Sequence, residues 1–422
     1  MKIKQYPSGL RLVVNTKNDL NIVSFKIYVN AGARNESKDE YGLAHFLEHM
    51  FFKSTPNYNY QEISALFDGL GTKINAFTGT HNTCYFFKSL KNVFESSLKI
   101  FSEMFFNTTY DLREMTNEKK VVIEEYKMSK DDVQRSCIIN AFKSLYEGSE
   151  LDRDIIGTPK TIRSFKVEDL KRFKSRNYLP QNIVISVSGK IKLKEMERLL
   201  KKYFAPLLEG NFDGNYELAS FVNVKPKNKF ISQNKDNEQT FVYVLTELGK
   251  KTNKQMYAFD LLFAILGYGM SSKFFTTIRS EKGLVYNIDA GTQTIGTNNL
   301  AEISFSTSND KVCEALTSIL SIIKDCANGN ISLDELEKSK NKYIAGLVYS
   351  KETNSDVSGI NGASLINENK IEMQKQIESD VRAISLEQII TCAKEFYAQE
   401  NYVVSCIGKC QKSNLYCYNH WQ

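Results

Sequence analysis

The chain has 422 residues, of which 42% are hydrophobic, 25% charged and 12% aromatic. These proportions are typical of a globular protein and exclude the disordered, collagen-like and coiled-coil classes. The net charge of +6 is small beside 55 basic and 49 acidic residues, and no basic run is interleaved with aromatics, so no nucleic-acid partner is expected. No stretch approaches the roughly 20 apolar residues that cross a bilayer, so no membrane partner is expected either.

The hydrophobic pattern predicts strands and helices in both halves of the chain. Strand composition occurs at residues 22–29, 73–77, 84–87, 240–245 and 300–306. Helical spacing occurs at residues 60–67, 93–106, 112–128, 167–176, 257–266, 312–327 and 333–348. Because these elements follow no strict βαβ rhythm, they predict an α+β fold in which helices pack on one face of a mainly antiparallel sheet in each domain.

A faint internal repeat divides the chain into two halves. Residues 167–191 and 386–410 align at a constant offset, and each copy carries an amphipathic helix, a turn and a β-rich strand that ends in Gly-Lys. The same element order at a half-chain offset predicts two homologous domains. Their expected boundaries are residues 1–208 and 236–422, joined by a linker rich in Gly, Asn, Lys and Pro at residues 209–235.

The eight cysteines are scattered from Cys84 to Cys417, mostly inside apolar runs. No segment has the pattern of a signal or transit peptide, so we interpret them as reduced core thiols of a cytoplasmic protein. Cys410, Cys417 and His420 lie together near the C-terminus. A metal site there is disfavoured because a fourth ligand is missing, and the sequence assigns no role to this tail.

Two of the four histidines lie in one apolar segment, Gly42-Leu-Ala-His45-Phe-Leu-Glu48-His49-Met50. On a helix, His45 and His49 are one turn apart on the same side, which allows two imidazoles to bind one Zn²⁺. Glu48 is close enough to act as a general base on a water molecule. Polar side chains among apolar neighbours need partners, and a metal supplies one. This H-x-x-E-H order is the inverzincin signature.

A catalytic zinc needs a third protein ligand and an open position. The candidates lie in residues 117–126, where Glu118 and Glu125 are two turns apart on one helix face and Glu124 is turned by about 100°. One carboxylate on this face would bind the metal, and a second would orient a histidine. Spacing alone does not choose between Glu124 and Glu125.

The chain resembles the pitrilysin/insulinase family of inverzincin zinc metallopeptidases, in the branch of mitochondrial processing peptidase and its bacterial relatives. The similarity covers nearly the whole chain, through PSGLRLVV, VNAGARNESKDEYGLAHFLEHMFFKST, the N-A-x-T segment and EKKVVIEEY. In the family the latter of the paired glutamates is the ligand, which implies Glu125 as the third zinc ligand and Glu118 as its supporting carboxylate. The resemblance also implies the LuxS/mitochondrial processing peptidase-like metallohydrolase fold and one Zn²⁺ per chain.

The second half carries a further family feature, Arg279-Ser-Glu-Lys-Gly-Leu-Val-Tyr286. In the family, the arginine and tyrosine of this stretch help to bind the substrate and stabilise the transition state. The chemistry agrees, because a guanidinium and a phenol can both donate hydrogen bonds to a developing oxyanion.

The resemblance implies a peptide substrate that adds as an extended strand to the sheet edge at residues 73–78. Asn75, Ala76 and Phe77 would then contact the peptide near the scissile bond. His81 stands where many relatives have an acidic residue, and we interpret it as a tolerated loop residue.

Family members build a chamber from four such domains, so a chain with two implies a dimer. Both the zinc motif and the Arg/Tyr pair are present, which favours a homodimer in which Arg279 and Tyr286 act on the partner's site; a heterodimer is the alternative. The expected activity is that of a zinc-dependent endopeptidase acting on short unfolded peptides or leader and precursor peptides. The competing interpretation is a non-catalytic or partner-dependent subunit of a heterodimer.

Overall fold

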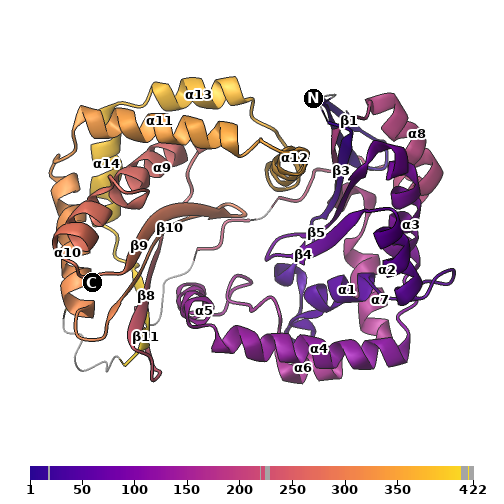
Figure 1. Ribbon diagram of the computed structural model, residues 1–422, viewed down its shortest axis with the longest axis horizontal. Coiled ribbons are helices and arrows are strands. Elements are labelled where there is room, and N and C mark those ends of the chain that lie inside the picture. The colour runs from indigo at the N-terminus through magenta and orange to yellow at the C-terminus, as the bar shows by residue number, and fades with distance from the viewer. Residues whose placement is uncertain (18–19, 219, 224–228, 410–416, 418–422) are drawn as a thin grey trace. The chain divides into compact units, whose positions relative to one another are not determined.

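The computed structural model describes residues 1–422 except 18–19, 219, 224–228, 410–416 and 418–422. The chain divides into two compact units (Figure 1). The first unit comprises residues 1–127, 153–219 and 350–371, and the second comprises residues 128–152, 220–349 and 372–422. Within the described ranges, no helix is long and apolar enough to cross a membrane.

The first unit is built on a six-stranded sheet with the order β1-β2-β6-β3-β5-β4. β2 runs parallel to β6, and the other neighbouring strands are antiparallel. β4 lies at the edge. The strands are β1 (Lys2–Gln5), β2 (Arg11–Thr16), β3 (Ile22–Val29), β4 (Lys73–Thr78), β5 (Thr83–Leu90) and β6 (Ile183–Gly189).

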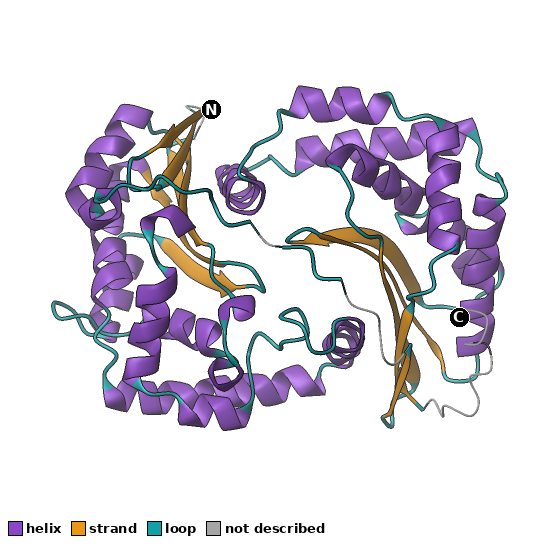
Figure 2. Ribbon diagram, turned by 180° about the vertical axis from the view of Figure 1, so that it is seen from behind, coloured by secondary structure: helices purple, strands orange, loops and turns teal. Residues whose placement is uncertain are grey.

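Helices cover both faces of this sheet (Figure 2). On one face a large apolar core joins Phe25 and Phe87 of the sheet to Phe101. The helices of the N-terminal half are α1 (Leu43–Phe51), α2 (Tyr60–Gly69), α3 (Phe94–Asn107), α4 (Leu112–Asp131), α6 (Pro159–Ser164), α7 (Val167–Asn177) and α8 (Leu193–Tyr203). The other face packs against α12 (Asn354–Glu368), which comes from the C-terminal half of the chain.

The second unit repeats this plan with a five-stranded sheet of order β7-β11-β8-β10-β9. One face carries the large apolar core, and α5 (Val133–Leu145) packs on the other. The strands are β7 (Phe230–Asn234), β8 (Gln239–Glu247), β9 (Asn287–Ile295), β10 (Asn298–Ser308) and β11 (Val403–Gly408). The remaining helices are α9 (Asn253–Gly267), the π-helix η6 (Phe274–Glu281), α10 (Val312–Ala327), α11 (Leu333–Tyr349), α13 (Gln374–Arg382) and α14 (Leu386–Tyr397).

The internal repeat corresponds to equivalent parts of the two units. Its copies form α7 with β6 and α14 with β11. β6 and β11 each pair in parallel with one neighbour, β2 or β7, and antiparallel with the other, β3 or β8. The prediction of two homologous α+β domains with mainly antiparallel sheets is confirmed.

The units differ from the predicted domains in one respect: they are not contiguous in sequence. Each contains a helix from the other half of the chain, so each sheet is covered on both faces rather than on one. The physical reason is that the second faces are also apolar, with Tyr28 and Val184 buried beneath α12, and Tyr243 beside α5. The change of unit at residues 219–220 falls within the predicted linker at 209–235.

Two cysteines depart from the sequence-based expectation. Cys417 is buried and forms a disulfide with Cys313 in the first turn of α10, with the two Cα atoms 5.3 Å apart. The prediction that all eight cysteines are reduced thiols is therefore wrong for this pair, because the fold brings together residues 104 positions apart. Cys410 and His420 lie outside the described residues.

Candidate metal centre

The helix α1 carries the H-x-x-E-H motif and is held firmly in the first unit. Leu43, Phe46, Leu47 and Met50 follow helical spacing and are buried in the core, which turns the histidines toward α4. At the N-terminus of the helix, Gly42 has a φ of +91°, a conformation that favours glycine. A Cβ at this position would lie 2.3 Å from the carbonyl oxygen of residue 156, so glycine is also required by packing.

The buried carboxylate of Glu36 completes the start of α1. Its two oxygens accept hydrogen bonds from the backbone N–H groups of Gly42 and Ala44, at 3.0 and 2.8 Å. Arg153 donates to the carbonyl oxygens of Ala33 and Arg34 in the preceding turn, at 3.1 and 2.8 Å. The Glu36 contacts satisfy N–H groups that a helix start leaves without partners, and the Arg153 contacts hold the turn that precedes α1.

His45, His49 and Glu125 form the cluster that fits a metal ion within the described chain, and their ligand atoms lie within 4.8 Å of one another. The Glu125 Oε2 atom is 3.4 Å from His49 Nε2 and 3.8 Å from His45 Nε2. Ligands bound about 2.0–2.2 Å from a tetrahedral Zn²⁺ lie roughly 3.3–3.5 Å apart. The two imidazoles and the carboxylate therefore fit this ion in donor type, and their ligand atoms lie close to the spacing that it needs.

Glu124 and Glu125 take different directions from α4. The side chain of Glu124 is 65% exposed and pairs with Lys127 at 2.7 Å, whereas Glu125 faces both histidines. The geometry thus brings Glu125 to the site and leaves Glu124 out, as the family resemblance implies.

Glu118 orients His49 from one side of the cluster. Its Oε1 is 2.8 Å from His49 Nδ1, and its Oε2 pairs with Lys53. Burial opposes the ionisation of Glu118, but the hydrogen bonds from His49 and Lys53 outweigh it and hold its pKa below the ordinary value. A carboxylate on Nδ1 leaves Nε2 directed at the metal position and makes it a better ligand.

Without a metal, the same carboxylates favour a protonated His49. Burial by itself would lower the pKa of His49, but hydrogen bonds to Glu118 and Glu125 raise it to about 9. Metal binding must therefore displace a proton from this ring.

Glu48 lies beside the cluster and is buried at 8% exposure. Its Oε2 accepts a hydrogen bond of 2.8 Å from the hydroxyl of Thr78 at the end of β4. Burial raises the pKa of Glu48, and nearby Glu125 adds to this, while Thr78 and His49 oppose it. A carboxyl group with a raised pKa beside a metal position is suited to accept and return a proton.

Of the remaining residues that the sequence singled out, three belong to the first unit and two to the second. Asn75, Ala76 and Phe77 lie on the edge strand β4, with Phe77 44% exposed. Arg279 and Tyr286 belong to the second unit, where both are exposed and the Arg279 guanidinium lies 4.5 Å from the Phe275 ring centroid.

His81 is buried in the loop between β4 and β5 and is not a member of the metal-type cluster found within the described ranges. Its interpretation as a tolerated residue stays a prediction.

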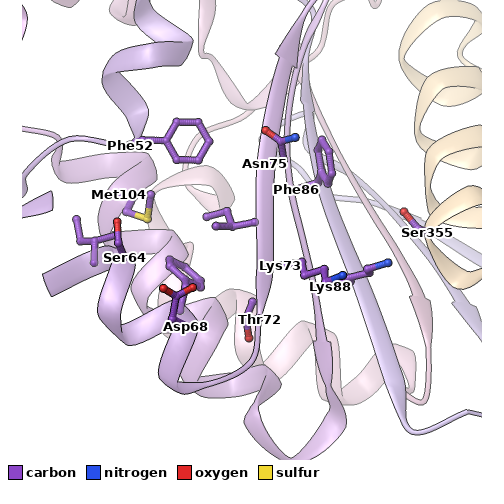
Figure 3. Close-up of a pocket in the computed structure, with 13 residues that line it drawn as sticks. Phe52, Ser64, Asp68, Thr72, Lys73, Asn75, Phe86, Lys88, Met104 and Ser355 are labelled. Carbon is purple, nitrogen blue, oxygen red and sulfur yellow. The ribbon is translucent and has the colours of Figure 1, made fainter. Parts of the chain in front are cut away.

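A cavity of about 590 Å³ adjoins the edge strand β4 (Figure 3). Phe52, Met104, Ser64 and Asp68 lie on one side of β4, and Lys73, Lys88, Phe86 and Ser355 lie on the other. All the residues that line this cavity belong to the first unit.

Sequence reasoning did not identify Glu36, Lys53 or Thr78. Glu36 had a local signal, an acidic residue shortly before the glycine that starts the motif helix. Thr78 is the threonine of the N-A-x-T segment, but nothing in that segment indicates its contact with Glu48. Lys53 had no signal, because its contact with Glu118 joins segments that are distant in sequence.

Two family models match the chain. The model for "Insulinase (Peptidase family M16)" matches residues 12–159, and the model for "Peptidase M16 inactive domain" matches residues 164–343. The metal-type cluster lies within the range of the first model.

Bacterial relatives match over most of their length. The "uncharacterized zinc protease YmxG" of Bacillus subtilis (strain 168) is 30% identical over 96% of this chain and 98% of the relative. An "uncharacterized zinc protease" of Rickettsia bellii (strain RML369-C) is 27% identical over 83% of this chain and 84% of the relative. The solved structure of a protease from Helicobacter pylori shares the fold, with a TM-score of 0.86 and 23% sequence identity. The match covers 96% of this chain and 99% of the Helicobacter chain. The chain therefore belongs to peptidase family M16, the insulinase family.

Proposed function

We propose that this protein is a zinc-dependent endopeptidase that hydrolyses short unfolded peptides or leader and precursor peptides. The observation that carries the proposal is the convergence of His45, His49 and Glu125 beside the buried carboxyl of Glu48. Membership of family M16, whose bacterial relatives are named as zinc proteases, supports the same chemistry.

His45, His49 and Glu125 would hold the ion. A bound Zn²⁺ supplies Lewis-acid chemistry, since it polarises a carbonyl group and acidifies water. Glu48 would accept a proton from the attacking water and return it to the leaving amine. The hydroxyl of Thr78 orients Glu48 by donating to one of its oxygens, which leaves the other oxygen for this proton transfer.

The edge strand β4 offers the peptide a place to bind. Its position at the end of the sheet leaves one row of backbone groups without a neighbouring strand. An extended peptide could add there by main-chain hydrogen bonds, which give affinity with little sequence preference. Asn75, Ala76 and Phe77 would then contact the peptide, and Thr78 at the end of the strand is in contact with Glu48.

We further propose a cytoplasmic homodimer in which Arg279 and Tyr286 of one subunit act at the metal site of the other. Support comes from the presence of both residue sets in one chain and from the exposure of Arg279 and Tyr286. A heterodimer with a second M16 chain is the alternative.

The Glu48→Gln variant tests the proposed chemistry. We expect one zinc per chain in both the wild type and the variant, because Glu48 is not in the ligand cluster. We also expect peptide cleavage by the variant to fall about 10²–10⁴-fold, the usual contribution of a general acid–base group. Zinc content by atomic absorption and cleavage of a pool of unstructured peptides measure the two effects.

Three results would change the assignment. Wild-type protein without zinc would remove the metal centre. Equal cleavage by both proteins would remove the role of Glu48. Zinc without cleavage by the wild type would favour a partner-dependent subunit, and activity restored by a second M16 chain would establish it.

A further inference from the structure

Two lysines on the sheet face each other without a counter-charge. Lys73 on β4 and Lys88 on β5 are directly opposite in the strand register, and both line the cavity beside the edge strand. Like charges in this arrangement destabilise a sheet. Neither side chain has an acidic partner within 4 Å in the part of the chain that the structure describes.

A third lysine lies on the same face of the sheet. Lys26 on β3 is opposite Phe86 in the register, and its Nζ lies 4.2 Å from the Phe86 ring centroid. Lys26 is only 7% exposed, and its burial lowers the pKa of the ammonium group. Among the described residues Lys26 forms no ion pair within 4 Å; the nearby Cys84 and Asp356 favour its charged form, and the charge of Lys88 opposes it.

The cavity wall facing the lysines adds positive potential of its own. Ser355 lies in the first turn of α12, and the N-terminus of a helix carries a partial positive charge. Asp356 offsets part of this, but its Oδ2 is held by the N–H of Thr353 at 3.0 Å. Asp68, the acidic residue among those that line the cavity, lies on the opposite side of β4 from the lysines (Figure 3).

We propose that the lysine cluster (Lys26, Lys73 and Lys88) binds a carboxylate of the peptide substrate. The inference rests on the proposed endopeptidase function and names the substrate class that the β4 edge would select. The carboxylate is an acidic side chain or the C-terminal carboxylate of a short peptide. Either group would relieve the repulsion between the lysines and form charge-assisted hydrogen bonds with their ammonium groups.

The position of the cluster sets how far this carboxylate lies from the cleaved bond. Lys73 begins β4, and Thr78, which contacts Glu48, ends it. Five residues of an extended strand span about 17 Å. We therefore expect the anionic group about four to six residues from the scissile bond.

The test measures peptide binding separately from peptide cleavage. Full-length protein carrying Glu48→Gln, which is expected not to cleave, is titrated with fluorescently labelled peptides that share one neutral sequence. One peptide ends in an amide, one ends in a free carboxylate, and a series carries a single Glu at successive positions with an amide end. The measured quantity is the Kd of each peptide from fluorescence anisotropy.

Anionic peptides should bind about tenfold more tightly than the neutral amide, because hydrogen bonds to charged groups are worth more than one decade in affinity. The free-carboxylate peptide and the Glu series distinguish the two sources of the anion. In Lys73→Gln and Lys88→Gln proteins, the Kd of the neutral amide peptide divided by the Kd of an anionic peptide should fall toward one. Lys99→Gln, which removes an exposed lysine on α3, should leave the ratio unchanged.

Equal Kd values for neutral and anionic peptides would overturn the proposal. So would a preference for anions that Lys73→Gln and Lys88→Gln leave intact, or an absence of binding by every peptide. Wild-type cleavage of the neutral peptide is scored on its own, so failure of the endopeptidase function would be seen separately from failure of the lysine cluster.

Discussion

At the residue scale, two adjacent glutamates on α4 differ in the direction of their side chains and in the groups that they contact. Glu125 points at both histidines from 3.4 and 3.8 Å, whereas Glu124 points to solvent and pairs with Lys127. Helical spacing places these neighbours about 100° apart but does not say which one faces α1. In physical terms, the packing of α4 beside α1 decides between them, in agreement with the family resemblance.

These two glutamates provide a matched pair of variants. Glu125→Gln removes a charged ligand, so we expect the protein to lose its zinc and its peptidase activity. Glu124→Gln removes an exposed charge and should change neither by more than about twofold, since exposed ion pairs contribute little. Zinc content after dialysis and cleavage of an unstructured peptide check both expectations, and zinc loss in Glu124→Gln alone would reverse the assignment.

At the element scale, α12 illustrates how a helix can be hidden in sequence. Its sequence, NSDVSGINGASLINE, contains two glycines and no strong apolar stripe, so periodicity does not predict it. One of these glycines, Gly362, is what allows the helix to pack. A Cβ at Gly362 would lie 2.4 Å from the Tyr28 ring, so only glycine permits this approach.

We therefore expect Gly362→Ala to destabilise the first unit. Overpacking of this kind costs about 1–3 kcal/mol, more than alanine gains through its helix propensity. Gly346→Ala on α11 is the matched control, because a Cβ there meets nothing within 4 Å. Urea denaturation should show a lower midpoint for Gly362→Ala and an equal or higher one for Gly346→Ala. Equal midpoints for both would show that α12 is not packed as described.

A buried carboxyl group on α9 makes the stability of the second unit depend on pH. Burial raises the pKa of Asp260 to about 6, while hydrogen bonds from Thr292 and Tyr343 oppose the shift. The folded state therefore holds this proton more tightly than the unfolded state. Its contribution to stability is complete below the unfolded pKa of 3.8 and is lost as the pH rises through 6.

The Asp260→Asn variant isolates this effect. Relative to the wild type, its free energy of unfolding should improve by roughly 2–3 kcal/mol between pH 4 and pH 8, since one pKa unit corresponds to about 1.4 kcal/mol. Urea denaturation of both proteins at the two pH values measures the change. A difference between the proteins that is the same at both pH values would contradict the raised pKa.

At the scale of the whole molecule, the proposed dimer makes a quantitative prediction. We consider a heterodimer of Glu48→Gln and Arg279→Ala chains, purified through two different affinity tags. If Arg279 acts on the partner's site, one of the two sites is complete and about half of the wild-type activity returns. If Arg279 acts within its own chain, both sites are defective and the heterodimer is inactive. A monomeric wild type in light scattering would exclude action between subunits altogether.

The Cys313–Cys417 disulfide bears on where the protein works. Stable disulfides are typical of oxidising compartments, whereas the other described cysteines are buried and belong to no disulfide. Cytoplasmic localisation therefore stays a prediction, and fractionation of cells with mass spectrometry of the two cysteines under non-reducing conditions tests it.

Sequence alone determined the features that depend on local spacing. The helical period brings His45, Glu48 and His49 together within two turns. The strands predicted from composition and the helices predicted from helical spacing are present. The repeat at residues 167–191 and 386–410 likewise revealed the duplication, because both copies preserve the same order of helix, turn and strand. The family resemblance added the choice of Glu125, which spacing left open.

Tertiary structure decided what depends on contacts between distant segments. It joined Lys53 to Glu118 and Thr78 to Glu48, exchanged α5 and α12 between the halves, joined Cys313 to Cys417, and set Lys73 opposite Lys88. The exchange of helices arises because each sheet has two apolar faces to bury. The helix that covers the second face comes from the other half of the chain. Hydrophobic periodicity records that a face is buried but not which segment covers it, so these features become visible only in three dimensions.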